Sequence, residues 1–137
     1  MSTTPDTVVL PQTPFSRTAV AVSAEVAFHN PTNMVDLLLA GDNPNGARIT
    51  KLYAIPRAAV GADLNCQLYK RAGATYILIN SVKMPAHTPS ATVANAKADF
   101  GYSIDSPLEL VAGEGLAVAI GAGIANGVAF FCNGGLY

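Results

Sequence analysis

The sequence predicts an all-β protein: an antiparallel β-sandwich, jelly-roll-like, with about eight short strands and an extended N-terminal arm. Three observations support this fold class. Short apolar segments alternate with a period of two. Turn-forming Gly, Pro, Asn and Asp separate these segments at intervals of roughly 8–12 residues, and few windows free of Gly and Pro are long enough for a helix.

The chain of 137 residues suits a single domain with a core of its own. A chain near this length buries about two-thirds of its unfolded surface, so neither metal nor disulfide is needed for stability. We expect residues 1–15 to form the extended arm and residues 16–137 to form the β-sandwich domain. Three prolines exclude a helix in the arm, which has one short apolar stretch at residues 8–10.

The first half of the domain shows the clearest strand signals. Residues 64–71 alternate between an apolar face, which includes Leu64 and Leu68, and a face that includes Gln67 and Tyr69. A turn at Ala72-Gly73 joins this strand to a second one, so residues 64–84 are expected to form a hairpin. The other strands expected here span residues 18–24, 34–40 and 48–56, with a turn at 41–46.

The second half contains three further expected strands, at residues 108–111, 115–120 and 127–132. Residues 90–100 fit two structures. They could form a helix with Ser90 as its N-cap, or an extended loop, since prolines and threonines lie close by. Alanine is frequent throughout, and its small side chain allows close packing of sheets or of neighbouring subunits.

The charge content argues against two classes of partner. Only 12% of residues are charged and the net charge is −1, whereas soluble domains average about 25% charged residues. A nucleic-acid-binding protein needs a basic surface, and a polybasic membrane patch needs clustered cations. We therefore expect no nucleic acid and no membrane as partner.

No apolar run approaches the roughly 18 residues of a membrane span, and the first residues lack the features of a signal peptide, so synthesis in a cytoplasm is expected.

The two cysteines, Cys66 and Cys132, lie far apart and form no metal-binding motif. The sequence allows one disulfide between them or two free thiols. We expect two small buried apolar residues in a reducing compartment.

The chain is poor in catalytic groups. His29 and His87 lie beside prolines in expected loops, no nucleophile elbow is present, and the His-x-His pair of cupin-like metal sites is missing. The acidic residues form no recognisable pair or calcium loop. Residues 121–127 superficially resemble a dinucleotide-binding loop, but no helix follows, so a hairpin turn is expected. We therefore expect no catalytic residue, no cofactor and no metal.

Aromatic residues suggest a surface for a partner. Phe130 and Phe131 are adjacent, so they point to opposite faces of a strand. If Phe130 is in the core, either Phe131 is exposed on an outer face or the strand is buried on both faces. The five tyrosines could stack on a sugar, although packing on strand faces is the simpler use. Candidate interface residues are Val8, Val9, Leu10, Phe15, Phe131 and Tyr137.

The order of several segments resembles that of small jelly-roll decoration proteins, also called auxiliary or minor capsid proteins, of tailed bacteriophages. The segments that carry the resemblance lie at residues 31–41, 45–52, 66–73, 107–120 and 127–135. The resemblance implies a jelly-roll fold, no enzymatic activity, self-association as a homotrimer and attachment to the major capsid protein at the capsid surface of the virion. It assigns no functional residue.

On this interpretation the chain stabilises a shell by burying surface between capsid subunits, with many copies acting together. Removing residues 2–15 should then leave a folded domain that no longer binds capsids. A phage fibre or adhesin module that binds a host glycan or receptor is the alternative. A cupin-like metalloenzyme is a third possibility, which bound metal in the purified protein would reveal.

Overall fold

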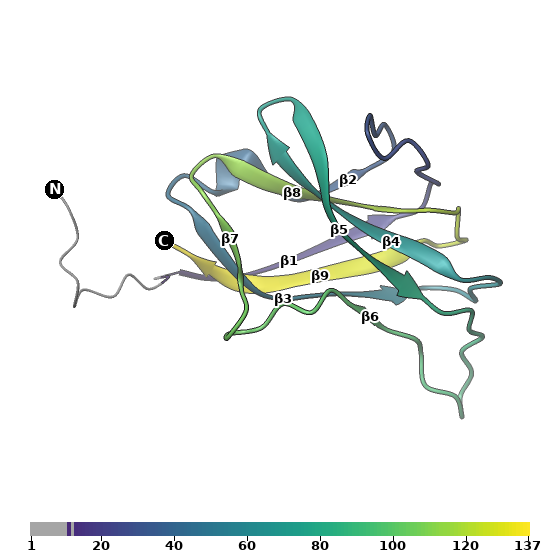
Figure 1. Cartoon of the computed structure of the whole chain (residues 1–137). Helices are drawn as coiled ribbons and strands as arrows, with labels where there is room; N and C mark the ends of the chain where they lie inside the picture. The colour runs from purple at the N-terminus through teal and green to yellow at the C-terminus, as the bar shows by residue number, and fades with distance from the viewer. Residues whose placement is uncertain (1–10, 12) are drawn as a thin grey trace, which may run out of the picture.

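A computed structural model describes residue 11 and residues 13–137, which fold into two antiparallel sheets packed face to face (Figure 1). In sheet A, β1 (Thr13–Ala21) pairs with β9 (Val128–Leu136) and β9 with β3 (Ala47–Pro56). The far edge of β3 pairs with two short strands, β6 (Ala98–Asp99) and β7 (Leu108–Leu110). Sheet B has the order β2 (Val35–Leu38), β8 (Glu114–Ile120), β4 (Leu64–Ala72) and β5 (Thr75–Met84).

The strand order is that of a jelly roll. Strands β6 and β7 pair with different parts of the same edge of β3, so together they occupy one strand position. Eight positions result. Apart from the β4–β5 hairpin, each connection between positions crosses from one sheet to the other, so that β1 lies beside β9 and β2 beside β8. The prediction of an all-β antiparallel sandwich is confirmed. The hairpin expected at residues 64–84 is also present, as β4 and β5.

Some boundaries differ from those expected. Strand β1 begins at Thr13, so residues 13–15 belong to the first sheet strand rather than to the arm. Residues 1–10 and 12 lie outside the described part. Residues 90–97 contain neither helix nor strand, and the Ser90 hydroxyl accepts a hydrogen bond from the Val93 N–H in a single turn (3.1 Å). The short 3₁₀ helix η1 (Ala40–Asp42) follows β2.

The core lies between the sheets and follows the predicted alternation. Sheet B contributes Leu64, Cys66 and Leu68, and sheet A contributes Phe130 and Cys132. Both thiols are free and buried, as expected from the sequence. Buried alanines on the inner strand faces, such as those at positions 21, 47 and 54, leave room for close packing of the two sheets.

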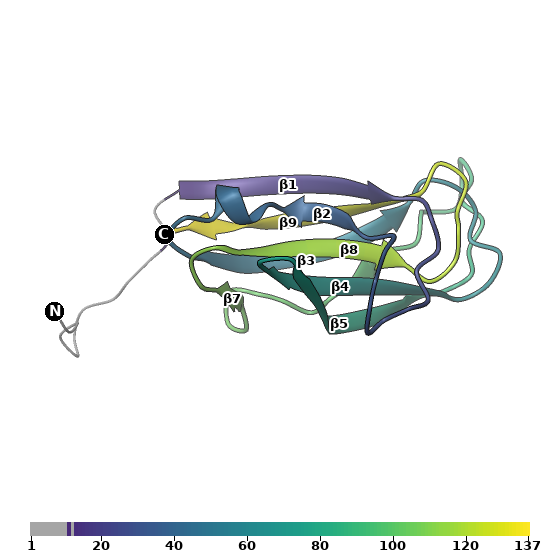
Figure 2. The ribbon, with the colours of Figure 1, turned by 90° about the horizontal axis from the view of Figure 1, so that it is seen from above.

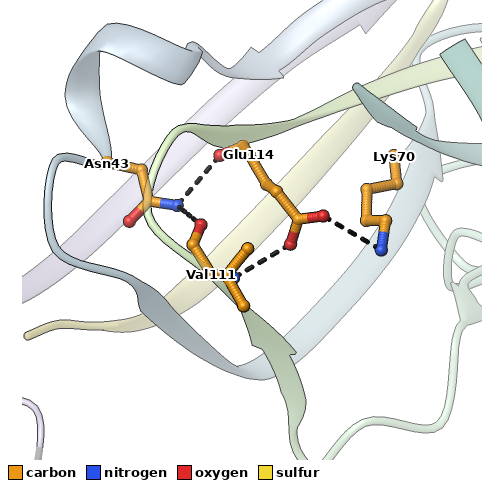
Figure 3. A network of polar contacts seen from close by, with 4 residues as sticks. All are labelled: Asn43, Lys70, Val111 and Glu114. Atoms are coloured by element: carbon orange, nitrogen blue, oxygen red, sulfur yellow. Dashed lines mark hydrogen bonds and ion pairs between the residues drawn. The ribbon is translucent and has the colours of Figure 1, made fainter. Parts of the chain in front are cut away.

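A buried amide joins two corners of the sandwich (Figure 3). Asn43, which is fully buried, donates from Nδ2 to the main-chain oxygens of Val111 (3.0 Å) and Glu114 (2.9 Å). The Glu114 carboxylate accepts the Val111 N–H and pairs with Lys70. These contacts fix the connection between β2 and β3 against the turn between β7 and β8.

Candidate functional site

The two histidines lie apart from any cluster of reactive groups. His29 is exposed in the loop between β1 and β2, and the main chain of His87 forms two hydrogen bonds with that of Val60. Among the residues that the structure describes, no three His, Cys, Asp or Glu side chains gather so that they could hold a metal ion. No helix within the described ranges is long and apolar enough to cross a membrane.

Sheet B has its outer face covered by the chain itself. The loop of residues 22–34 runs across β8 and β4 (Figure 2), where the Glu25 N–H donates to the Ile120 oxygen (2.7 Å). Gln67 Nε2 donates in turn to the Glu25 main-chain oxygen (3.0 Å). Tyr69 points outward from β4 but is fully buried, because this loop and its neighbours pack over it.

A buried carboxylate organises this loop. Glu25 is 1% exposed, and its side chain accepts backbone N–H groups from Ala27 (3.0 Å), Thr32 (2.8 Å) and Asn33 (2.6 Å). Burial raises the pKa of Glu25, but the three N–H donors outweigh this effect, so the pKa lies below its ordinary value. The charge therefore stays on the carboxylate and closes the loop over sheet B.

Sheet A, by contrast, carries a partly exposed aromatic pair on its outer face. The rings of Tyr53 on β3 and Phe131 on β9 stack with centroids 5.1 Å apart and an interplanar angle of 21°. Val20 and Ile55 lie on the same side in the next row of the sheet. We call Val20, Tyr53, Ile55 and Phe131 the outer patch. All four side chains are half-buried.

Two cations lie against the Tyr53 ring of the outer patch, and a third follows β3 in the sequence. The ammonium groups of Lys51 and Lys97 lie 5.5 and 4.6 Å from the centre of the Tyr53 ring. Arg57 follows directly after β3 and is exposed. These three residues are the Lys and Arg side chains that form no ion pair within the described part of the chain. Their charge is therefore available to a partner.

The candidate interface residues have different environments. Phe15 is 9% exposed and belongs to the core, so its side chain stabilises the domain and is not free for a partner. Phe131 faces outward and is half-buried, which lies between its two predicted environments. Tyr137 lies on the same side of sheet A at its end, where its hydroxyl donates to Glu109 (3.0 Å). The other three candidates, Val8, Val9 and Leu10, lie outside the described residues.

The chain enters sheet A on its outer side. A Cβ atom on Gly135 of β9 would collide with Pro11, so the absence of a side chain at Gly135 allows Pro11 to pass over the strand. Pro11 therefore lies over the outer face of sheet A at Gly135, four positions along β9 from Phe131.

A polar pocket of about 390 Å³ lies on the other side of the molecule. The loop between β1 and β2 and the turn between β4 and β5 form its walls. Beside it, Asp36 accepts a hydrogen bond from the Tyr76 hydroxyl (3.3 Å) and pairs with Arg71 (3.4 Å). The residues that line it are His29, Asn30, Pro31, Met34, Ala74, Thr75 and Tyr76.

Sequence reasoning missed several of these residues. Tyr53 and Lys51 carry a usable signal, because they alternate with the buried Leu52 and Ala54 in β3. Glu25 carries none, since a single carboxylate in a loop gives no indication of the backbone that wraps it. A scan against protein-family models finds no match to the chain, and a search of curated proteins finds none either.

Proposed function

We propose that this chain is a non-enzymatic structural protein of the virion that decorates and stabilises the capsid of a tailed bacteriophage. Its partners are the major capsid protein and further copies of itself in a homotrimer. The protein is made in the host cytoplasm and resides on the capsid surface. The observation that carries this proposal is the contrast between the two sheets. The loop of residues 22–34 covers sheet B, whereas the outer patch on sheet A is only half-buried and three cations near it form no ion pair with any described residue.

The outer patch has the composition of a protein interface. Aromatic side chains at the centre of an interface supply most of its apolar contact area, and those held in one orientation lose little entropy on binding. The Tyr53–Phe131 stack holds both rings in place before any partner arrives. The cations at Lys51, Lys97 and Arg57 favour a partner surface that is apolar at its centre and acidic at its rim.

The position of Pro11 adds a second contact. Pro11 lies over Gly135 on the same face of sheet A as the outer patch, and the apolar stretch Val8–Leu10 precedes it in the sequence. A segment of this composition contributes apolar area when it becomes ordered on a partner. Many weak contacts of this kind, repeated over a shell, hold its subunits together through avidity.

A binding experiment with capsids that lack this protein tests the proposal. Phe131→Thr removes the aromatic centre of the outer patch while keeping a residue suited to a strand. Ile77→Thr makes the same kind of change on β5 of sheet B, where Ile77 is 55% exposed. We expect Phe131→Thr to weaken capsid binding at least tenfold and Ile77→Thr to leave it unchanged. Thermal unfolding should show that both variants are folded, and equal binding by both would contradict the proposal.

Truncation tests the contribution of the arm. Removing residues 2–15, as the sequence first suggested, would also remove the start of β1 and the core residue Phe15. Removing residues 2–10 avoids this and keeps Pro11 over Gly135. The shorter truncation should unfold at the temperature of the full chain but bind capsids more weakly. Undiminished capsid binding would exclude a role for the arm.

A fibre or adhesin module that binds a host glycan or receptor is the second candidate. The polar pocket beside Tyr76 favours it, because a concave site of this size can hold part of a receptor or glycan. A module of this kind would be present in a few copies per particle, whereas a decoration protein would be present in many.

A further inference from the structure

The pocket beside Tyr76 combines a fixed apolar floor with a polar rim. We call the two half-buried lining residues Met34 and Tyr76 the floor, because both pack against the buried cluster around Tyr69 on the outer side of sheet B. Arg71 lies over the Tyr76 ring, with its guanidinium carbon 5.3 Å from the centroid. The hydrogen bond from Tyr76 to Asp36 fixes the ring further. The floor is therefore held in place without a ligand.

The rim is formed by His29, Asn30 and Thr75, all of which are exposed. An imidazole, an amide and a hydroxyl together offer both hydrogen-bond donors and acceptors. The wall that carries His29 and Asn30 does not depend on a ligand for its shape. The Glu25 carboxylate fixes this part of the loop through the backbone of Thr32 and Asn33.

The charges around the pocket decide the class of ligand. Among the described residues, no Asp, Glu, Lys or Arg side chain lines it, and the adjacent charged pair, Asp36 with Arg71, is already joined at 3.4 Å. A phosphate or carboxylate ligand would therefore find no free cation for a charge-assisted hydrogen bond. A neutral ligand with many hydroxyl groups and one apolar face fits both floor and rim.

We propose that this pocket binds a neutral saccharide unit. The C–H face of a pyranose ring would pack on Met34 and Tyr76, and its hydroxyl groups would bond to His29, Asn30 and Thr75. The volume of about 390 Å³ lies near the lower end of the range for small-molecule sites, roughly 300–1,000 Å³, and suits a single sugar ring. This inference does not rest on the capsid role, because the pocket and the outer patch lie on different sheets.

Backbone amide NMR of the full chain tests this assignment, with D-glucose, D-galactose, N-acetyl-D-glucosamine and inorganic phosphate as separate probes. We expect at least one sugar to shift the amide signals of residues 29–34 and 74–76 in a saturable manner. Phosphate should leave these signals unchanged. A saturable response to phosphate, or no response to any of the three sugars, would overturn the proposal.

Three variants place the response in the pocket. Ala74→Tyr fills the pocket from an exposed position, and His29→Ala removes part of its rim. Phe28→Ala is the matched control, since Phe28 is exposed on the same loop but does not line the pocket. We expect the first two to weaken sugar binding at least tenfold and the control to bind as the unmodified chain does. Equal binding by Ala74→Tyr and Phe28→Ala would place the sugar elsewhere and overturn the assignment.

The same variants separate this site from the decoration role. Ala74→Tyr and His29→Ala should lose sugar binding and still bind capsids.

Discussion

The Asn33 N–H donates to Glu25 Oε2 at 2.6 Å, and this contact between positions eight apart closes a loop over the outer face of sheet B. The same carboxylate accepts two further backbone N–H groups, from Ala27 and Thr32. One buried side chain thus satisfies three main-chain donors that the loop cannot pair internally. The loop in turn covers Tyr69 and forms one wall of the pocket beside Tyr76.

Glu25→Gln should destabilise the fold measurably. The substitution replaces a charged acceptor with an amide whose NH₂ group cannot accept the N–H donors of the loop. Hydrogen bonds to charged groups contribute about 1.5–3 kcal/mol each, so we expect a loss of about 2–3 kcal/mol in the free energy of unfolding by urea. Asp105→Asn, at an exposed position, is the control and should change this value by less than about 0.5 kcal/mol. A Glu25→Gln protein as stable as the control would show that the loop closes without the carboxylate.

Glu25 should also make the stability of the fold decrease in acid. Although burial raises the pKa of Glu25, its backbone donors hold it below the unfolded value. The stabilisation is therefore complete above the unfolded pKa, near 4.3, and is lost as the pH falls through the folded pKa. We expect the free energy of unfolding to decrease between about pH 6 and pH 3, and to decrease less in Glu25→Gln. Identical pH profiles for the two proteins would contradict this assignment.

In Glu25→Gln, the free energy of unfolding should still decrease somewhat in acid. The pKa of Glu114 is raised by burial but lowered more by the Val111 N–H and by Lys70. Glu114 therefore makes a separate contribution with the same sign.

Asn43→Ala should loosen the corner between β2 and β3. The substitution leaves the main-chain oxygens of Val111 and Glu114 without their amide donor in a buried setting. An unsatisfied buried polar group costs about 1–3 kcal/mol, so we expect a loss of about 2–3 kcal/mol, measured by urea unfolding. Asn45→Ala, in the same turn but exposed, should have little effect. A larger loss for Asn45→Ala than for Asn43→Ala would refute the role given to Asn43.

The thiols should be unreactive in the folded protein. Burial raises the pKa of Cys66 to about 12, and that of Cys132 to about 12 despite the opposing charge of Arg17. At pH 8 about one thiol in ten thousand would then be ionised, and the thiolate is the reactive form. Titration with a coloured disulfide reagent should detect no fast-reacting thiol in the native state and two after denaturation. A fast native reaction, or no thiol after denaturation without reductant, would contradict the burial of two free cysteines.

The sequence predicts the sandwich well because strand alternation is a local property. The face of β4 that carries Cys66 and Leu68, for example, follows from residue type and a period of two. The outward direction of Phe131 follows from the burial of its neighbour Phe130. The extent of burial does not follow in this way. Tyr69 has the sequence pattern of an exposed residue, yet a loop that begins more than thirty positions earlier covers it.

The candidate sites depend on contacts between distant segments, which periodicity does not reveal. Lys97 lies near Tyr53 because β6 pairs with β3, and the pocket forms where residues 29–34 meet residues 74–76. The prolines around Phe15 predict that it belongs to the arm. In the structure, the pairing of β1 with β9 extends to Thr13, so Phe15 lies within β1 and its side chain packs in the core.

The central claim is that this chain decorates a capsid in many copies. Its most direct test is the copy number of the protein, relative to the major capsid protein, in density-banded particles of the phage whose genome encodes it. We expect a high ratio that stays fixed between preparations, because decoration places a copy at every equivalent site of the shell. A handful of copies per particle would instead favour the fibre or adhesin function, and complete absence from the particles would contradict any role in the virion.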